Sequence, residues 1–254
     1  MNNLKNKILW IYHSFFNQKL IKSSKIFWND NYKKYNGSRV FIVCNGPSLT
    51  MEDLDAIKDE YSIASNKIYL AFSETQWRPN FLTVSDRILW NKIKNTIYKY
   101  YYPIILTSNL INHNKNKSIL IKNIGSFKNN NNGFSKDMNK GIFGGRTVTY
   151  NNIQLAVHLG FKEIYLIGCD HYYDEKIPSS STIVEHNEGV NNHFHKDYRH
   201  KGEKVNYAPV DIMETAYQNA KNNLEQLNIK IYNASRKTHL DIFEKINFDD
   251  LFVQ

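Results

Sequence analysis

Residues 45–48 are the first stretch of the chain whose types suit the binding of an anion. They follow FIVC, a short apolar run that is typical of a buried strand. After Asn45, Gly46 allows a tight turn or a close ligand approach, Pro47 fixes the backbone, and Ser48 stands where it would cap a helix. This arrangement directs free backbone N–H groups toward an anion. The alternative is a plain strand-to-helix connection that binds no ligand.

A second stretch with chemical potential, NHFHKDYRH at 192–200, is rich in histidine. We expect His193 and His195 on one side of an extended segment, where their spacing suits a metal ion together with Asp170 and His171. The same histidines suit a catalytic or acceptor-binding loop. A structural or solvent-exposed cluster is the third alternative. Because the spacing alone is weak evidence for a metal, our prediction is a site without one.

The elements that would position these residues alternate along the chain. Apolar runs that we expect to be strands lie at 39–44, 61–69, 81–85, 102–109, 161–170 and 229–235. Helices are expected between them, at 50–59, 86–93, 144–160 and 210–228. This alternation predicts a Rossmann-like α/β fold, with a mostly parallel sheet and helices on both faces. Two polar excursions interrupt it, a segment at 112–141 that we expect to be mobile and a lid-like segment at about 174–207.

The residues that follow each expected strand are informative, because ligands of such sheets bind outside the carboxyl ends of the strands. All six exits consist of small or polar residues: Asn45-Gly46, Ser65-Asn66, Ser85-Asp86, Thr107-Ser108-Asn109, Gly168-Cys169-Asp170-His171 and Asn233-Ala234-Ser235. Each exit alone is weak, since polar exits are common in α/β proteins. Together they predict a polar crevice at one edge of the sheet.

The composition narrows the class of protein. The chain has 254 residues, is 41% hydrophobic and carries a net charge of +9. No apolar run is long enough to span a bilayer, and no zinc-finger or helix-turn-helix pattern indicates nucleic-acid binding. The basic charge suits anionic lipid or an anionic sugar nucleotide. Cys44 and Cys169 each end an apolar run, so we expect buried thiols and a cytoplasmic location.

The N-terminal segment differs from the rest of the chain. Residues 4–28 are basic, aromatic and apolar at roughly helical spacing, and no small-residue cleavage site follows them. We divide the chain into a helical segment, 1–36, and a Rossmann-like nucleotide-sugar-binding domain, 37–254. The segment either packs on that domain or lies as a peripheral anchor on the inner-membrane surface.

Three stretches of the chain carry a family resemblance. FIVCNGPSL, GGRTVTYNNIQLAVHLGFKEIYLIGCDHYYDE and NHFHKDYRHKGE resemble the bacterial DUF115 (MAF, MptE-like) family, whose members are common among genes for surface glycans. The first two also look like family 42 bacterial sialyltransferases. Those enzymes have a Rossmann-like fold and transfer a nonulosonic acid from its CMP derivative without a metal. Another branch of the DUF115 family works as an archaeal pterin pyrophosphokinase.

The resemblance implies a donor-binding site. The helix mouth from Gly145 to Thr149 would supply contacts to phosphate or sugar hydroxyls, and Tyr172 matches a tyrosine that bonds the departing phosphate. Asp170 is either a cap for the segment after its strand or a catalytic residue. The residues expected to contact the donor are Asn45, Gly46, Pro47, Ser48, Asn66, Ser85, Asp86, Gly145, Arg146, Thr147 and His171.

The resemblance also implies a general base. An acceptor hydroxyl must lose a proton, and the sialyltransferases use a histidine from a loop shortly before the last large helix. Here Asn206 or Tyr207 stands nearest to that position, so this chain departs from the pattern. Our first choice for the base is His195, followed by His193 and His171.

The leading hypothesis is a glycosyltransferase in cell-surface glycan assembly, such as that of lipopolysaccharide or capsule. Its donor would be a CMP-activated nonulosonic acid, its acceptor a hydroxyl of a glycan or lipid-linked glycan, and it would need no cofactor. The alternatives are a pterin or other pyrophosphokinase that uses ATP and Mg²⁺, and a non-catalytic nucleotide-binding partner in glycan assembly. We expect no nucleic acid partner, and homo-oligomerisation is left open.

Overall fold

One eight-stranded sheet organises the chain. The computed structural model describes residues 8, 10, 11, 15, 17–110, 114, 116–129, 133–173, 183–186 and 191–253. The strands of the sheet are β1 (Arg39–Val43), β2 (Ser62–Ser65), β3 (Phe81–Val84), β4 (Ile104–Thr107), β5 (Ser118–Ile121), β8 (Glu163–Ile167), β11 (Lys230–Asn233) and β12 (Glu244–Lys245). They pair in the order β12-β11-β8-β1-β2-β3-β4-β5, and every pair is parallel. The predicted Rossmann-like α/β fold is therefore confirmed.

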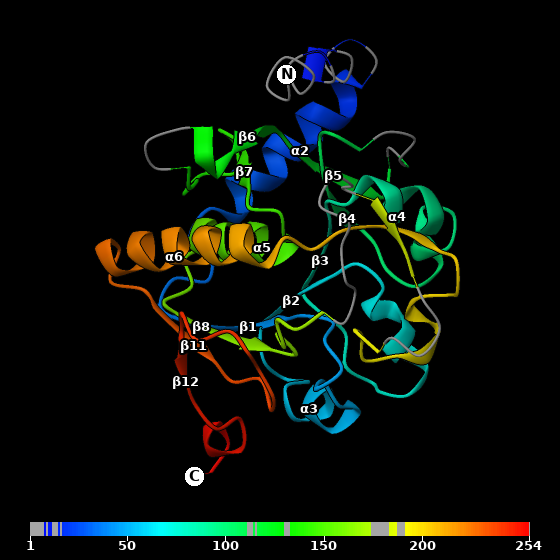
Figure 1. Ribbon diagram of the computed structural model, residues 1–254. Coiled ribbons are helices and arrows are strands. Elements are labelled where there is room, and N and C mark those ends of the chain that lie inside the picture. The colour runs from blue at the N-terminus through cyan, green and yellow to red at the C-terminus, as the bar shows by residue number, and fades with distance from the viewer. Residues whose placement is uncertain are drawn as a thin grey trace.

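Helices cover both faces of this sheet (Figure 1). The helices α5 (Val148–Leu159) and α6 (Val210–Gln226) pack together on one face, against side chains such as Val40 and Ile42. The short helices α3 (Met51–Ala56) and α4 (Arg87–Ile93) pack on the other face, against alternate residues of the same strands. Because both faces are covered, the central strands are apolar without alternation.

The N-terminal helix α2 (Gln18–Asn31) packs on the sheet at its β5 edge. Buried Trp28 donates from Nε1 to Leu120 O (2.9 Å), and Leu120 N–H donates to Ser24 Oγ (2.9 Å). These bonds satisfy backbone groups that an edge strand would otherwise leave open. The domain boundary at residue 36 and contact with a membrane surface stay predictions. In the part of the chain that the structure describes, no helix has the length and apolar character needed to span a bilayer.

Two predictions about the polar excursions were wrong or incomplete. Residues 112–141 were expected as one mobile segment, but they contain the edge strand β5, whose four residues are all buried, and the strand β6 (Asn123–Ser126). β6 pairs with β7 (Ile142–Gly144) outside the main sheet. The excursion at 174–207 contains a small antiparallel pair, β9 (Ile183–Glu185) with β10 (Lys204–Asn206). Short strands flanked by asparagine and lysine lack the periodicity that sequence patterns detect.

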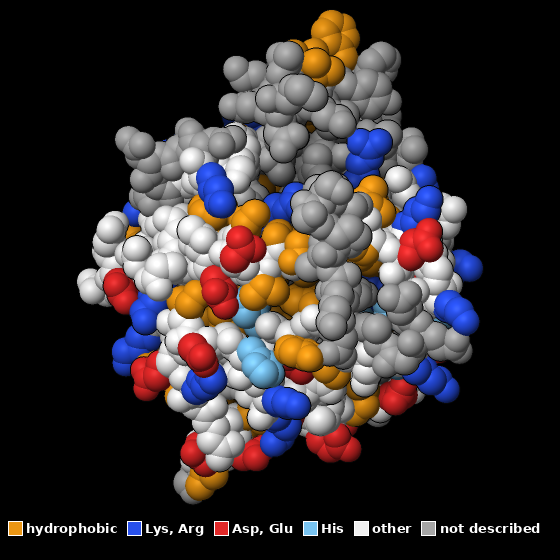
Figure 2. Space-filling model, viewed as in Figure 1, with side chains coloured by type: hydrophobic (Ala, Val, Ile, Leu, Met, Phe, Trp, Pro, Cys, Tyr) orange, Lys and Arg blue, Asp and Glu red, His pale blue; other side chains and the backbone are white. Residues whose placement is uncertain are grey.

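The strand order creates a switch point beside β1. The chain leaves β1 toward β2 on one side, whereas β8 pairs with β1 on the other. Ligands of such sheets bind at the carboxyl edge beside a switch point of this kind. On the face of the molecule shown in Figure 2, basic and acidic side chains are interspersed, and histidine side chains lie near the middle.

Candidate functional site

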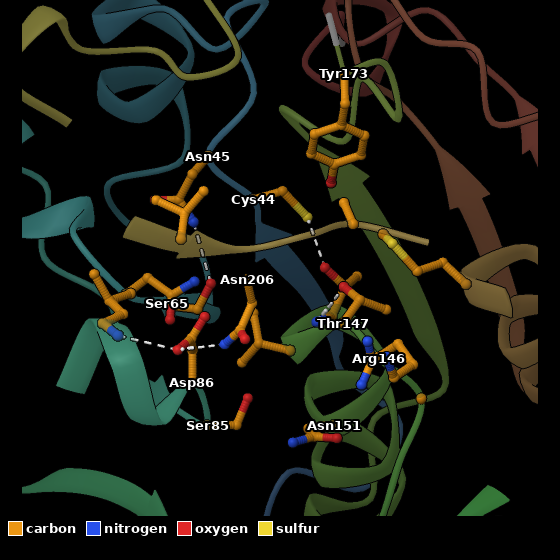
Figure 3. A pocket seen from close by; sticks show the side chains of 18 of the residues that line it. Cys44, Asn45, Ser65, Ser85, Asp86, Arg146, Thr147, Asn151, Tyr173 and Asn206 are labelled. Carbon is orange, nitrogen blue, oxygen red and sulfur yellow. Dashed lines mark hydrogen bonds between the residues drawn. The ribbon is translucent and has the colours of Figure 1, made fainter. Parts of the chain in front are cut away.

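A cavity of about 530 Å³ opens at the carboxyl edge of the sheet, and we call it the cleft. Five of the six predicted strand exits line it, those of β1, β2, β3, β4 and β8. The sixth exit, residues 233–235, does not, because Ser235 Oγ accepts a hydrogen bond from Cys169 N–H (2.8 Å) beneath the β8 loop. In Figure 3, Asn45 lies on one side of the cleft, and Arg146 and Asn151 lie on the other.

The turn at residues 45–48, which we call the Asn45 turn, differs from the expectation. Its backbone donors are occupied within the protein: Gly46 N–H donates to Gly168 O (2.8 Å), and Ser48 N–H donates to Asp170 Oδ2 (2.8 Å). Ser48 Oγ donates to Asp170 Oδ1 (2.5 Å). The carboxylate of Asp170 thus takes the place in which an anionic ligand was predicted. Asn45 and Gly46 line the cleft, whereas Pro47 and Ser48 do not.

Asp170 also explains the glycine of this turn. A Cβ atom on residue 46 would lie 2.3 Å from Asp170 Oδ1 and 2.6 Å from Gly168 O, so no side chain fits there. The expected cap of the next helix was wrong, because Thr50 and not Ser48 caps α3. Thr50 and Asp53 form a reciprocal capping box. Burial raises the pKa of Asp170, while the hydrogen bonds from Ser48 oppose that rise.

The mouth of α5, residues 144–149, forms another wall of the cleft, and we call it the α5 entrance. Thr147 caps the helix by accepting from Thr149 N–H (3.2 Å). Gly145 packs so closely on Tyr150 that a Cβ would lie 2.6 Å from its ring. Arg146 is exposed, adopts a left-handed φ of 65°, and lines the cleft. The first turn of α5 contains no acidic residue, so its positive end faces the cleft without a carboxylate of its own.

Asparagine oxygens are the most consistent polar feature of the cleft wall. The side-chain nitrogen of Asn45 donates to Ser65 Oγ (3.2 Å), and that of Asn109 donates to Ser85 O (3.3 Å). The side-chain oxygens of both residues are buried. Buried side-chain oxygens that have no hydrogen-bond partner among the described residues belong to Asn45, Asn66, Asn109 and Asn151, all of which line the cleft. A buried acceptor without a partner costs free energy until a donor meets it, so these atoms indicate a ligand with hydroxyl or amino groups.

Left-handed backbone conformations mark the same wall. Asn66 (φ 61°), Arg146 (φ 65°) and His171 (φ 56°) are non-glycine residues with positive φ, and all three line the cleft. A left-handed conformation of such a residue costs free energy, so it persists only where the surrounding structure imposes it. Residues of this kind cluster at binding and catalytic sites. The structure therefore brings three predicted site residues together in strained conformations on one cavity.

Residues 191–208, which we call the covering segment, are hydrogen-bonded to residues that follow the strands of the sheet. Phe194 N–H donates to Asn45 O (3.1 Å), and Lys67 Nζ donates to Tyr198 O (2.6 Å). Lys92 Nζ donates to Glu203 Oε1 (2.8 Å), which contributes to a Glu203 pKa lowered to about 2. Asn206, which stands nearest to the sialyltransferase histidine, donates to Asp86 Oδ1 (2.9 Å) at the cleft wall (Figure 3).

The two leading candidates for the base occupy different surroundings, so the expectation that they share one side of an extended segment was wrong. His193 lines the cleft, but its Nδ1 lies 3.3 Å from Asn45 O and its Nε2 accepts from Arg199 Nε (3.4 Å). Burial and Arg199 lower the pKa of His193 to about 3. His195 does not line the cleft, because it caps a short 3₁₀ turn and lies 3.4 Å from Glu74.

The third candidate, His171, lies in the cleft wall directly after Asp170. Its imidazole is buried, and Nε2 lies 3.4 Å from Glu214 Oε1 on α6. Tyr172 also lines the cleft, and its half-exposed ring lies 5.1 Å from the ring of His239. The predicted contact of Tyr172 with a departing phosphate stays a prediction.

Ser85 and Asp86 lie where the sequence predicts, in the wall that follows β3. Asp86 Oδ1 accepts from Ile88 N–H (2.7 Å) and Leu89 N–H (3.0 Å), so it caps α4. Asn206 adds a third donor to the same oxygen. A carboxylate that receives three hydrogen bonds is a structural anchor between the sheet exit and the covering segment.

Sequence reasoning missed several residues of the cleft. Asn151 lies one turn into α5, and a helical asparagine gives no signal on its own. Glu214 does not line the cleft itself but lies 3.4 Å from His171 Nε2, and its place on α6 is far from the motifs that the resemblance covers. Asn109 ends a predicted strand exit, and its place there was the available signal. No cluster of three or more metal-ligating side chains occurs among the residues that the structure describes, and the absence of a metal stays a prediction.

Fold and cleft together define a Rossmann-like α/β protein with a polar cavity at the carboxyl edge of its sheet. The family model described as 6-hydroxymethylpterin diphosphokinase MptE-like matches residues 12–176. The chain therefore belongs to the MptE-like family, as its DUF115 resemblance predicted. The match covers β1 to β8 and the β8 exit, and ends before the covering segment and α6. Neither a curated protein nor a solved structure matches the chain, and a relation to the sialyltransferases stays a prediction.

Proposed function

We propose that this protein is a glycosyltransferase that moves a sugar from a nucleotide-activated donor to a hydroxyl of a bacterial surface glycan. A CMP-activated nonulosonic acid is the donor that we favour. The family name, a diphosphokinase, supports the broader class of a transferase-type enzyme. The observation that carries the proposal is the set of asparagine oxygens in the cleft wall that have no hydrogen-bond partner among the described residues, together with the α5 entrance.

The two walls suit the two chemical parts of a nucleotide sugar. At the α5 entrance, the positive helix end and Arg146 would hold the phosphate. The oxygens of Asn45, Asn66 and Asn151 would accept hydrogen bonds from hydroxyl or amino groups of the nucleoside and the sugar. A donor in this position would lie at the switch point of the sheet, where ligands of such folds bind.

This placement also suits the chemistry of transfer. When the bond between sugar and phosphate breaks, negative charge develops on the leaving phosphate. Arg146 and the N–H groups at the α5 entrance would stabilise that charge, and Thr147 and the packing of Gly145 fix the backbone there before any ligand arrives. Donors that are arranged in advance lower the barrier more than donors that must reorganise during the reaction.

The second candidate is a pyrophosphokinase, and the name of the matching family favours it. That reaction uses ATP with Mg²⁺, and the ion is normally held by carboxylates and phosphate oxygens. Asp86 and Asp170 are the carboxylates among the described residues that line the cleft. Both already accept hydrogen bonds from the protein, Asp86 from α4 and Asp170 from the Asn45 turn. These bonds already use one oxygen of Asp86 and both oxygens of Asp170, and this favours the glycosyltransferase.

A nucleotide panel tests the choice. The purified full chain would be heated with CMP, CDP, UDP, GDP or ATP, each with EDTA or with Mg²⁺, because a ligand of the folded state raises the melting temperature. We expect stabilisation by CMP or CDP that EDTA does not remove and that Asn45→Ala reduces. Release of CMP from CMP-N-acetylneuraminate would then be measured directly.

The other outcomes are equally clear. Stabilisation by ATP only in the presence of Mg²⁺ would replace the proposal with the pyrophosphokinase. A response to UDP or GDP would keep glycosyl transfer and discard the nonulosonic donor. If no nucleotide raised the melting temperature, the proposal would be abandoned. Asn247→Ala is the matched control for Asn45→Ala, because Asn247 lies near the C-terminus and does not line the cleft.

A further inference from the structure

His171 has an unusual position for a buried histidine. Its imidazole is 1% exposed, yet the residue lines the cleft and its backbone is left-handed. Neither ring nitrogen has a hydrogen-bond partner of good geometry among the described residues. In a buried imidazole at least one ring nitrogen normally forms a hydrogen bond. The burial of this ring without one therefore does not serve stability.

The surroundings of the ring come from three elements. Glu214 of α6 lies 3.4 Å from Nε2, and the ring of Tyr217, one turn further along α6, lies 5.7 Å away edge-to-face. The charge of His239, in the loop after β11, lowers the pKa of His171. Asp170 directly precedes His171 in the chain. Because Glu214 lies 3.4 Å from Nε2, it favours the tautomer with the proton on Nε2, in which Nδ1 carries the lone pair.

The charges around His171 set its protonation. Burial is the main cause that lowers its pKa below 6.5, while Glu214 raises it and His239 lowers it. The ring is therefore neutral at neutral pH, and Glu214 stabilises the charge that the ring acquires when it accepts a proton. His193 lacks these properties, because both of its nitrogens already contact protein groups.

We propose that His171 is the general base of the cleft and that Glu214 is its positioning residue. The inference rests on the proposed function in one respect, that the cleft transfers a group to a hydroxyl. In that step the acceptor O–H proton passes to Nδ1 of His171. The acceptor oxygen forms a bond to the anomeric carbon, and the bond from that carbon to the donor phosphate breaks, with its electron pair leaving on the phosphate.

The first test needs no substrate. Histidine ring resonances of the full chain would be followed by NMR against pH, with His171 identified by the signal lost in His171→Asn. We expect its midpoint below 6.5, and a still lower midpoint in Glu214→Gln, because the carboxylate that favours the charged ring is gone. A titration midpoint of His171 above 6.5, or one that is the same in the wild type and in Glu214→Gln, would overturn the inference.

The second test measures release of CMP from CMP-N-acetylneuraminate, with water or added glycan as acceptor. His171→Asn should lower kcat on the order of 10²-fold or more without changing the stabilisation by CMP. Glu214→Gln should lower the plateau rate roughly tenfold and move the acid limb of the pH profile to lower pH, because a weaker base accepts the proton less readily. Glu214→Asp should restore part of the rate.

The matched control is His200→Asn, since His200 is exposed and does not line the cleft. Its rate and pH profile should equal those of the wild type. Wild-type rates in His171→Asn would overturn the assignment of the base. Failure of the proposed function has a different signature, a wild-type chain that neither binds CMP nor releases it.

Discussion

The Asn45 turn and the α5 entrance look alike in sequence but differ in what they hold. Both contain glycine just before a helix, and both line the cleft. At the Asn45 turn the backbone donors bind Gly168 O and the carboxylate of Asp170. At the α5 entrance the first helical turn has no acidic residue, and Arg146 is exposed toward the cleft. One turn holds a carboxylate that belongs to the protein, whereas we propose that the other receives an anion from outside.

The difference shows that a turn suited to an anion does not reveal which anion it holds. Asp170 follows β8, which pairs with β1 in parallel, so the two exits emerge side by side. A carboxylate on one exit therefore reaches the donors of the other without any ligand. In this chain the glycine of the NGPS motif makes room for the side chain of Asp170, although the motif resembles a phosphate-binding turn.

The largest expected effect is on stability, and it distinguishes Gly46 of the Asn45 turn from Gly144 of the α5 entrance. Gly46→Ala places a Cβ 2.3 Å from Asp170 Oδ1, so the free energy of unfolding should fall by roughly 3 kcal/mol as the β1 and β8 exits are pushed apart. Gly144→Ala is the matched control, because its Cβ would lie 3.7 Å from the nearest atom, an ordinary contact. Its unfolding free energy should stay within about 1 kcal/mol of the wild type. Urea denaturation of both variants checks this, and equal stabilities would contradict the account of the Asn45 turn.

A smaller effect is expected at the α5 entrance, on binding and not on folding. Arg146→Gln should weaken the nucleotide identified in the panel about tenfold, or about 1.4 kcal/mol, because a charged contact to phosphate is lost. Stability should not change, since the side chain is exposed. Calorimetric titration at two salt concentrations measures the loss, and the difference from wild type should shrink at high salt. Lys230→Gln removes the same charge at the opposite edge of the sheet and should leave affinity unchanged; equal losses in both variants would indicate a long-range effect of net charge.

The smallest effect concerns the pH dependence of the Asn45 turn. Burial raises the pKa of Asp170 in the folded state, so the folded protein binds this proton more tightly than the unfolded chain does. The contribution of Asp170 to stability therefore falls as pH rises from about 3.9, the ordinary value, through the raised pKa, and is constant above it. Asp170→Asn should abolish this fall. The measurement is the difference between the unfolding free energies of the wild type and the variant across pH 3 to 7. A difference that grows with pH in favour of the wild type would mean that Ser48 lowers the pKa more than burial raises it.

Much of the fold follows from local patterns in the sequence. The runs at β1, β3, β4 and β8 are continuous and apolar because those strands are covered on both faces. The cap of α4 by Asp86 was also predictable, since an aspartate directly before a helix satisfies its first N–H groups. β5 was not, because its three apolar residues lie between asparagines and lysines, and their burial depends on α2, which contacts them from 92 and 96 residues earlier in the chain.

The sequence by itself determined that polar residues would follow each strand, and the parallel sheet then gathered five of those six exits into one cleft. Only the tertiary structure decided how they are used. It placed Asp170 in the Asn45 turn, turned His195 away from the cleft, and brought Glu214 to His171. The physical reason is that strand and helix propensities act between neighbours in sequence. Hydrogen-bond partners and pKa shifts depend on groups that meet only after the strands have paired.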